Sequence, residues 1–515
     1  MQRLLFSGAW LLILASFCVA AVAHADDDSS RISVNPSFAS GLSGWQTQGD
    51  VHVQKNAVDT GAHSVILGPG SGSVSQRIVA GGANHMMIEA TVHSQPAGLA
   101  ILSVRCLDKD GQELMTLRSP ADIRAGKEPD TFEQYFRPHP LTARVEIAVT
   151  KDGGQGTVTL NRLELDIYHD DDPVLESKQD VSELMRPFWR GRLVSDEAVL
   201  LTSRDGGPAT GTLMFRPARI VSVRSYDGAT QYREGADYSV QGRTVIAVAN
   251  SAISQVREPD LVKGDLAWNV IGGKQVLVTY EHEDSWTGPV QPYVGAELPV
   301  TLRLLRAHEP LRIVAYGDSI TYGLGSSRMR KIGPYQPPWV ELFAGELRRQ
   351  WNDPDIALYN SAQSGADSTW ARNMAERMVA SLHPDLVLIA FGQNDFWSIS
   401  PEDFSANISA VIQSVRQSSP QAEFLLVSTM RFDPAYSSDP GYWERVTEYQ
   451  ARLRAMVTKG VQLVDMTAIS GAIFAAKSPR DCLNDPLHPN DYLSRWYAQS
   501  LLAALSPEGR QSEGR

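Results

Sequence analysis

The regular alternation of short apolar runs with longer amphipathic segments between residues 311 and 505 constrains the fold of this chain most strongly. Short apolar runs are typical of buried strands, and the amphipathic segments have the spacing of helices. This alternation predicts a three-layer α/β domain, in which helices cover both faces of a parallel sheet. The expected strands are 313–316, 356–359, 385–391, 424–429 and 461–465, and the expected helices are 337–351, 368–382, 401–418, 441–458 and 491–505.

A chain of 515 residues is too long for a single hydrophobic core, so further domains are expected before the α/β domain. Residues 31–168 carry short alternating runs separated by Gly, Pro, Asn and Asp, which predict an all-β sandwich. Residues 185–305 repeat the pattern and predict a smaller β-rich domain. The charged segment 169–184 is interpreted as a linker, and residues 506–515 as a polar tail. The sequence therefore predicts two sandwich-like domains followed by an α/β domain.

The N-terminus has the pattern of an export signal. Arg3 precedes a long apolar run, and Ala23-His24-Ala25 offers a small-residue cleavage site after it. We expect residues 1–25 to be removed as a signal peptide, which predicts a periplasmic or secreted protein. An uncleaved anchor helix is the alternative, because the apolar run is nearly long enough to span a bilayer. No stable membrane insertion is expected after cleavage, because no later segment has membrane-spanning length.

Charge and cysteine content exclude several classes of protein. The formal net charge of -12 argues against a nucleic-acid partner, for which a basic stripe is expected. Cys106 and Cys482 remain after signal cleavage, and we expect two buried thiols rather than a bridge. Their spacing matches no metal site. No cluster in the sequence implies a metal ion or an organic cofactor, and nothing in it indicates the oligomeric state.

Polar residues and a glycine follow the expected strands of the α/β domain. Ser319 follows Gly-Asp where the first apolar run ends, Gly365 comes after the second strand, and Asn394 comes after the third. Asp485 and His488 lie together just before the last helix. Open α/β sheets bind their ligands at the carboxyl ends of the strands. These five residues are therefore expected to converge at one edge of the sheet.

At these residues the chain resembles the SGNH/GDSL hydrolase family, whose four sequence blocks supply a Ser, a Gly, an Asn and a His. The resemblance covers roughly residues 311–505. It implies an SGNH, flavodoxin-like fold, with Gly365 and Asn394 at oxyanion-hole positions. The four blocks in the right order are far more specific than the Gly-Asp-Ser motif alone, which is also ordinary turn chemistry.

The same residue types fit the chemistry of acyl transfer. A serine hydroxyl needs a base within hydrogen-bond reach, and His488 is the candidate. Asp485, three residues earlier, can accept the other imidazole N–H and fix its tautomer. The backbone N–H of Ser319, Gly365 and the side-chain amide of Asn394 would stabilise the oxyanion. Capping of its own loop is the alternative role for Asn394. Hydrolysis of an ester through a serine nucleophile is the expected reaction.

The N-terminal domain resembles jelly-roll carbohydrate-binding modules at two places. Asn35-Pro36-Ser37-Phe38 and Gly44-Trp45 resemble the first strand of such modules, and residues 158–165 resemble the closing one. Trp45 is interpreted as a core aromatic rather than as a platform for a sugar ring. The resemblance implies glycan binding, and a sandwich that only positions the enzyme is an equal alternative.

Export, the two β-rich domains and the resemblance together imply an acetylated polysaccharide or oligosaccharide as the substrate. An O-acetyltransferase, a lipid or thioester hydrolase, and a catalytically inactive glycan-binding protein are the alternatives. Aromatic residues near the motif loops fit sugar stacking or core packing, and these are Trp370, Phe396, Trp397 and Trp443.

Charged residues beside the motifs have simpler interpretations. Asp318 and Asp395 are assigned to loop structure. Arg328, Arg330 and Lys331 are interpreted as a solvated charge run, with recognition of an anionic substrate as the alternative.

Overall fold

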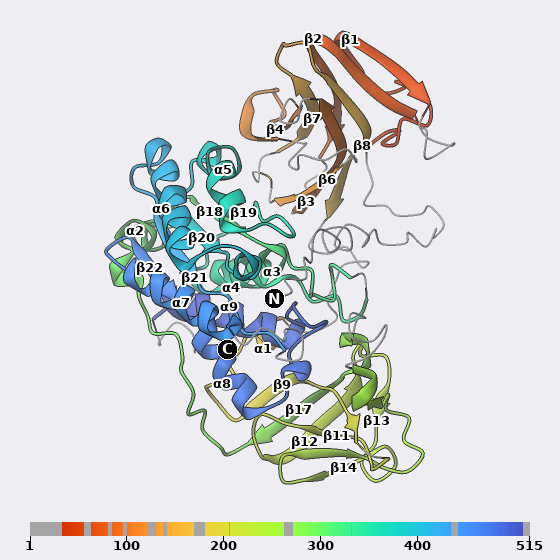
Figure 1. The fold of residues 1–515 in the computed structure, drawn as a ribbon, viewed down its shortest axis with the longest axis vertical. Helices are drawn as coiled ribbons and strands as arrows, with labels where there is room; N and C mark the ends of the chain where they lie inside the picture. The colour runs from red at the N-terminus through yellow and green to blue at the C-terminus, as the bar shows by residue number, and fades with distance from the viewer. Residues whose placement is uncertain are drawn as a thin grey trace, which may run out of the picture.

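The computed structural model describes residues 33–507, except 56–62, 81–84, 96–99, 121–129, 137, 139–141, 169–180, 205, 262–270, 331 and 434–440. Three bodies are stacked along the long axis, with the α/β domain between the two β-rich domains (Figure 1). The expected signal peptide, most of the expected linker and most of the tail lie outside the described residues. The predicted order of two β-rich domains and an α/β domain is confirmed.

The α/β domain is built on five parallel strands in the order β19-β18-β20-β21-β22. In chain order this is 2-1-3-4-5, the flavodoxin-like arrangement, so the predicted fold class is confirmed. The chain leaves β18 at the point where the strand order reverses, which is where such sheets bind ligands. The strands are β18 (Leu311–Gly317), β19 (Ile356–Asn360), β20 (Leu386–Ala390), β21 (Glu423–Val427) and β22 (Val461–Val464).

Alternate residues of each strand pack under helices on opposite faces of the sheet. Ile313 and Ala315 of β18 join one core cluster, and Val314 and Tyr316 join the other. The apolar runs are continuous because both faces are covered. The first face carries α2 (Pro299–Ala307), α4 (Trp339–Trp351), α8 (Met466–Ala476) and α9 (Asp491–Leu505), and the second carries α5 (Ser368–Met378), α6 (Pro401–Ser418) and α7 (Tyr442–Ala455).

Helix α9 is buried on every side, although the sequence suggests a single apolar stripe. One face packs on α4, and the small β-rich domain covers the other. Phe188 of that domain contacts Trp496, with ring centroids 5.2 Å apart. Arg495 donates hydrogen bonds to the carbonyls of Ser195 (2.7 Å) and Asp196 (2.6 Å). The two terminal nitrogens of this charged side chain are therefore satisfied by backbone carbonyls of a neighbouring domain.

The small domain consists of two sheets, with strand orders β14-β15-β11-β10-β16 and β13-β12-β17-β9. A buried polar network fixes it to the α/β domain. The Lys477 ammonium lies 2.5 Å from Glu197, and the Tyr280 hydroxyl donates to the same carboxylate at 2.6 Å. Buried charges are tolerated only when paired in this way. The strands are β9 (Leu193–Val199), β10 (Thr202–Ser203), β11 (Thr210–Thr212), β12 (Pro217–Ser225), β13 (Gln231–Tyr232), β14 (Tyr238–Gln241), β15 (Thr244–Ala247), β16 (Val256–Arg257) and β17 (Val276–His282).

The N-terminal domain is antiparallel and sandwich-like, as predicted. Its long strand β2 pairs with β1 along one edge, and along the other edge with β8 through residues 65–67 and then with β7 through residues 72–79. The strands are β1 (Gln46–Lys55), β2 (His63–Val79), β3 (His85–Gln95), β4 (Ala100–Leu107), β5 (Glu113–Pro120), β6 (Asp130–Phe136), β7 (Arg144–Lys151) and β8 (Thr157–Tyr168).

Trp45 packs in the core of this domain. Its side chain is buried against Phe38, with ring centroids 5.1 Å apart, and its indole N–H donates to the Asn35 carbonyl. A buried ring cannot stack on a sugar, so the core interpretation holds. Residues 35–45 form turns before β1, and the resemblance to a first strand is wrong in this detail.

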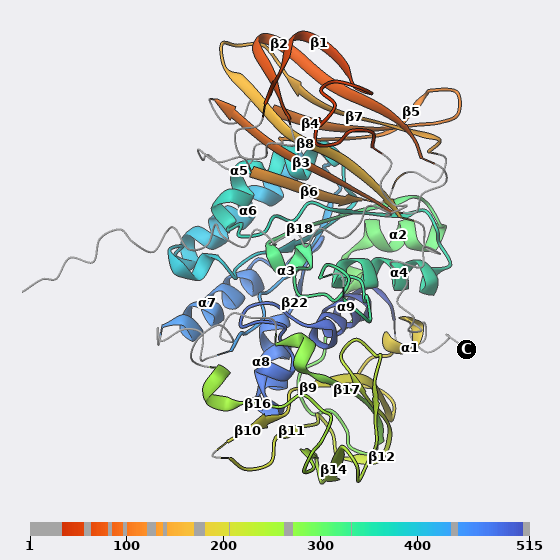
Figure 2. The same ribbon diagram turned by 90° about the vertical axis from the view of Figure 1, so that its right-hand side faces the viewer.

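The N-terminal sheet continues into the α/β sheet. Strand β6 pairs antiparallel with β19, with Phe136 opposite Tyr359 and Tyr135 opposite Asn360. Figure 2 shows the N-terminal strands lying directly over the α/β domain. The β19 edge of the parallel sheet is therefore covered by a strand from another domain.

In the part of the chain that the structure describes, no helix is both long and apolar enough to cross a bilayer. Cys106 and Cys482 are both buried free thiols, as expected.

Candidate active site

Ser319 stands at the carboxyl end of β18, on the first turn of the short helix α3 (Ser319–Tyr322). Asp318 caps this turn by accepting the Ile320 N–H at 3.0 Å. The Trp339 indole donates to the Ile320 carbonyl, and the Asn360 amide donates to the Thr321 carbonyl. These contacts hold the turn so that the serine leaves the strand at a fixed angle.

The structure brings Ser319, His488 and Asp485 into one hydrogen-bonded chain. Nε2 of His488 lies 2.9 Å from the Ser319 hydroxyl oxygen. Nδ1 of the same ring lies 2.9 Å from both carboxylate oxygens of Asp485. Asp485 also accepts the backbone N–H groups of Leu487 and His488, which folds the three-residue spacing into a tight loop. The nucleophile, base and orienting carboxylate have the geometry of a serine hydrolase triad.

The charges in this chain favour an ion pair once the imidazole accepts a proton. Burial disfavours the imidazolium, but the Asp485 carboxylate outweighs burial and raises the pKa of His488 above its ordinary value. Burial works against ionisation of Asp485, yet His488 and the hydrogen bonds to the carboxylate lower its pKa. Asp485 therefore stays ionised, and its charge can stabilise an imidazolium at His488.

Gly365 and Asn394 follow β19 and β20, the two strands that flank β18, and Asn394 contacts the residue after Gly365. Gly365 has a φ of +75°, a conformation that favours glycine. The Asn394 amide donates to the carbonyl of Ala366 at 2.9 Å and makes no capping bond to its own turn. Within the described residues, the backbone N–H groups of Ser319 and Gly365 donate to no acceptor. Two backbone donors and the second Asn394 N–H remain for a developing oxyanion.

Replacing Asn394 with Ala should therefore impair turnover more than substrate binding. Loss of one oxyanion donor costs on the order of 10²- to 10³-fold in kcat. Steady-state hydrolysis of an aryl acetate gives kcat and KM separately, and KM is expected to change little. A variant that keeps wild-type kcat would show that the amide serves only to hold Ala366.

Asp318 and Asp395 are both buried, and each accepts a backbone N–H in the first turn of a helix. Asp395 accepts the Ser368 N–H at 3.0 Å, where α5 begins. Burial raises the pKa of Asp318 to about 7 and that of Asp395 to about 6. Asp318 faces the imidazole and adds to the raised pKa of His488.

Arg330 is the residue of the site that sequence interpretation missed. The interpretation of a solvated run is wrong for it, because only 26% of its side chain is exposed. Nη2 of Arg330 lies 3.3 Å from Oδ2 of Asp485. With the Asn484 amide in the orientation that satisfies both its ends, its oxygen accepts from the Nε and Nη2 groups of Arg330. Arg328 pairs instead with Glu341 at 2.8 Å, and Lys331 lies outside the described residues.

Arg330 thus adds a fourth member to the chain of hydrogen bonds. Its charge lowers the pKa of both Asp485 and His488. The only sequence signal was its place in a basic run, because the aspartate that it contacts is 155 positions away.

Replacing Arg330 with Met should lower kcat/KM by about tenfold, the value of one charge-assisted hydrogen bond. The base must be neutral to accept the serine proton, so activity falls as the pH drops through the pKa of His488. Because the Arg330 charge lowers that pKa, its removal moves the acid limb of the kcat/KM profile to higher pH. Arg330→Lys keeps the charge and should leave the acid limb at its wild-type pH. Arg328→Met is the matched control. An unshifted limb in Arg330→Met would contradict this role.

The four aromatic residues near the motifs differ in how far they are buried. Phe396 is buried, whereas Trp397 beside it exposes 61% of its surface next to Asn394. Trp370 packs near Tyr316 in the second core cluster. Trp443 is half-buried on α7. Trp397 is therefore the most exposed of the four.

Residues 315–495 match the GDSL-like Lipase/Acylhydrolase family. The C-terminal part of the chain is thus a GDSL-like, or SGNH, hydrolase domain, and this family consists in general of carboxylic ester hydrolases. No curated protein sequence matches the chain.

Solved structures are similar to parts of this chain at low sequence identity. An acetylxylan esterase from Geobacillus stearothermophilus is 16% identical, with 40% of this chain and 97% of that chain covered and a TM-score of 0.34. The enzymatically active domain of bacteriophage CBA120 tailspike protein 4 is also 16% identical, with 27% of this chain but only 22% of that chain covered and a TM-score of 0.24. The TmCBM61 module, solved with β-1,4-galactotriose, is 19% identical, with 27% of this chain and 100% of that chain covered and a TM-score of 0.23.

Proposed function

We propose that this protein is an exported serine esterase that removes O-acyl groups, most simply O-acetyl groups, from a polysaccharide. The observation that carries the proposal is the unbroken chain from Ser319 through His488 to Asp485, with 2.9 Å at each step. Ser319 attacks the ester carbonyl, His488 takes its proton and passes it to the departing alkoxide, and water then releases the acid. Three N–H donors stabilise the tetrahedral oxyanion.

Export and a polymeric substrate are parts of the same proposal. The N-terminal Arg3, apolar run and Ala23-His24-Ala25 support a periplasmic or secreted location. Trp397 is exposed beside Asn394 and supports a sugar, because an aromatic face packs well on a sugar ring.

Acetate release tests the proposal directly. The wild-type chain should release acetate from at least one of a panel of acetylated plant and bacterial polysaccharides, and from an aryl acetate. The panel should be run with and without an added acetylated sugar acceptor, since transfer to sugar faster than to water would identify an acetyltransferase instead. Absence of both acetate release and labelling by a fluorophosphonate would leave a glycan-binding protein.

A further inference from the structure

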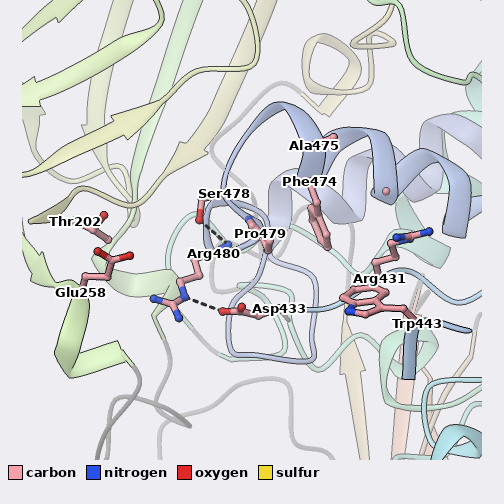
Figure 3. A pocket seen from close by; sticks show the side chains of 11 residues that line it. Thr202, Glu258, Arg431, Asp433, Trp443, Phe474, Ala475, Ser478, Pro479 and Arg480 are labelled. Atoms are coloured by element: carbon pink, nitrogen blue, oxygen red, sulfur yellow. Dashed lines mark hydrogen bonds and ion pairs between the residues drawn. The ribbon is translucent and has the colours of Figure 1, made fainter. Parts of the chain in front are cut away.

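A cavity of about 690 Å³ lies between the α/β domain and the small β-rich domain. Thr202 and Glu258 line it from the small domain, and residues of α7, α8 and the segments beside them line it from the α/β domain (Figure 3). Its wall touches the catalytic loop, because the Asp433 N–H donates to the carbonyl of Pro486 at 3.5 Å. Pro486 stands between Asp485 and His488. The cavity therefore adjoins the loop that carries Asp485 and His488.

Arg431 supplies the cavity with a positive charge that no described carboxylate neutralises. Its guanidinium lies over the ring of Trp443, with 5.0 Å to the centroid, and the two side chains lie together at one end of the cavity (Figure 3). Its Nε is buried and has no hydrogen-bond partner in the part of the chain that the structure describes. Gly471 of α8 makes room for this side chain, because a Cβ there would lie 3.1 Å from Nε.

The other charges of the lining are already compensated. Asp433 accepts a hydrogen bond from Nε of Arg480 at 2.7 Å. Glu258 is paired with Arg204. Each lining carboxylate thus has its own cation, and among the described residues the charge of Arg431 remains in excess. In a chain whose net charge is -12, an excess cation beside the site is selective for an anionic ligand.

The chemistry of the lining fits one class of ligand. Arginine binds carboxylate and sulfate groups through paired N–H donors, which lysine cannot do in the same way. Trp443 and Phe474 offer apolar surface, and Thr202 and Ser478 offer hydroxyl groups. Pockets that combine apolar walls with a few directed polar groups are typical of ligand sites.

We propose that this cavity is a subsite for an anionic sugar residue, carrying a carboxylate or a sulfate, of the same glycan whose ester is cleaved at Ser319. The inference rests on the proposed function and narrows its substrate class to acidic glycans. The Arg431 fork contacts the anionic group, and the polymer continues past the Asp485–His488 loop to the nucleophile.

Direct binding tests the subsite without any hydrolysis. The full-length protein is titrated in a calorimeter with three unacetylated probes, namely hexagalacturonate, a sulfated galactan oligosaccharide and neutral xylohexaose. The uronate or the sulfated probe should bind at least about tenfold more tightly than xylohexaose, and added NaCl should weaken that binding. Which of the two binds identifies the anionic group. Equal binding of all three probes, or of none, would overturn the inference.

Variants then place the binding at Arg431. Arg431→Met should weaken binding of the anionic probe about tenfold or more, and Gly471→Ala should weaken it by displacing the same guanidinium. Arg416→Met is the matched control, since Arg416 also lies over an aromatic ring, that of Phe424 at 5.2 Å, but does not line the cavity. Thermal unfolding reports whether each variant is folded. Unchanged affinity in a folded Arg431→Met protein would overturn the inference.

The two proposals fail separately. If the protein binds the anionic probe through Arg431 but releases no acetate from any substrate, the subsite proposal stands and the esterase proposal falls. If the protein deacetylates glycans without preferring acidic ones, and Arg431→Met does not change this activity, the esterase proposal stands and the subsite proposal falls.

Discussion

Replacement of Ser319 with Ala is expected to lower kcat for an aryl acetate by on the order of 10⁴- to 10⁶-fold. The hydroxyl lies 2.9 Å from Nε2 of His488, and the variant leaves the imidazole with no proton to accept. Residual turnover from the oxyanion donors alone should remain above that of water. Labelling by a fluorophosphonate, which reports the activated serine itself, should disappear as well.

Ser326→Ala is the matched control for this loss. Ser326 is a buried serine of the same loop, and among the described residues its hydroxyl accepts only the Met329 N–H, at 3.4 Å. It should keep wild-type labelling and turnover. If Ser319→Ala hydrolysed aryl acetates at the wild-type rate, the assignment of the nucleophile would fall.

Replacement of Asp485 with Asn is expected to cost about 10⁴-fold in kcat with little change in the fold. The amide can still meet Nδ1 of His488, but it presents an N–H where the carboxylate accepted one. The ring then carries its proton on Nε2, which faces Ser319 and can no longer accept the serine proton. The variant also removes the negative charge that stabilises the imidazolium.

Asp481→Asn separates this effect from the loss of any buried carboxylate. Asp481 lies four residues earlier, accepts the Leu200 N–H at 2.7 Å and lies 3.8 Å from Lys477. Its replacement should lower the melting temperature, because it disturbs the buried network between domains, and should leave turnover near wild type. A loss of turnover in Asp485→Asn no greater than that in Asp481→Asn would sink the orienting role.

The sequence was sufficient for elements whose pattern reflects their burial. The five parallel strands and the helices 401–418 and 491–505 are found within a few residues of their expected bounds, because a strand covered on both faces must be apolar throughout. Strand β1 was not predicted, because it is exposed along nearly its whole length and so shows no alternation. Helix α8 was not predicted either, because its small and apolar residues, among them Gly471, form no stripe.

The candidate site divides in the same way. Ser319, Gly365, Asn394, Asp485 and His488 follow from the ends of strands and from short spacings, which a sequence displays. Arg330 and Arg431 do not, because each takes its meaning from a side chain that folding brings to it. A basic residue in a run looks solvated until its partner is known, and here the partners are Asp485 and Trp443.

The pairing of β6 with β19 means that the N-terminal domain covers one edge strand of the catalytic sheet. An edge strand whose N–H and C=O groups are unpaired can pair with a strand of another chain. Natural proteins therefore cover or disrupt their exposed edge strands. Here the blocking strand comes from the domain that resembles a carbohydrate-binding module. A catalytic fragment that begins at residue 311 would expose the edge of β19 at Tyr359 and Asn360, so we expect it to self-associate more readily than the full chain.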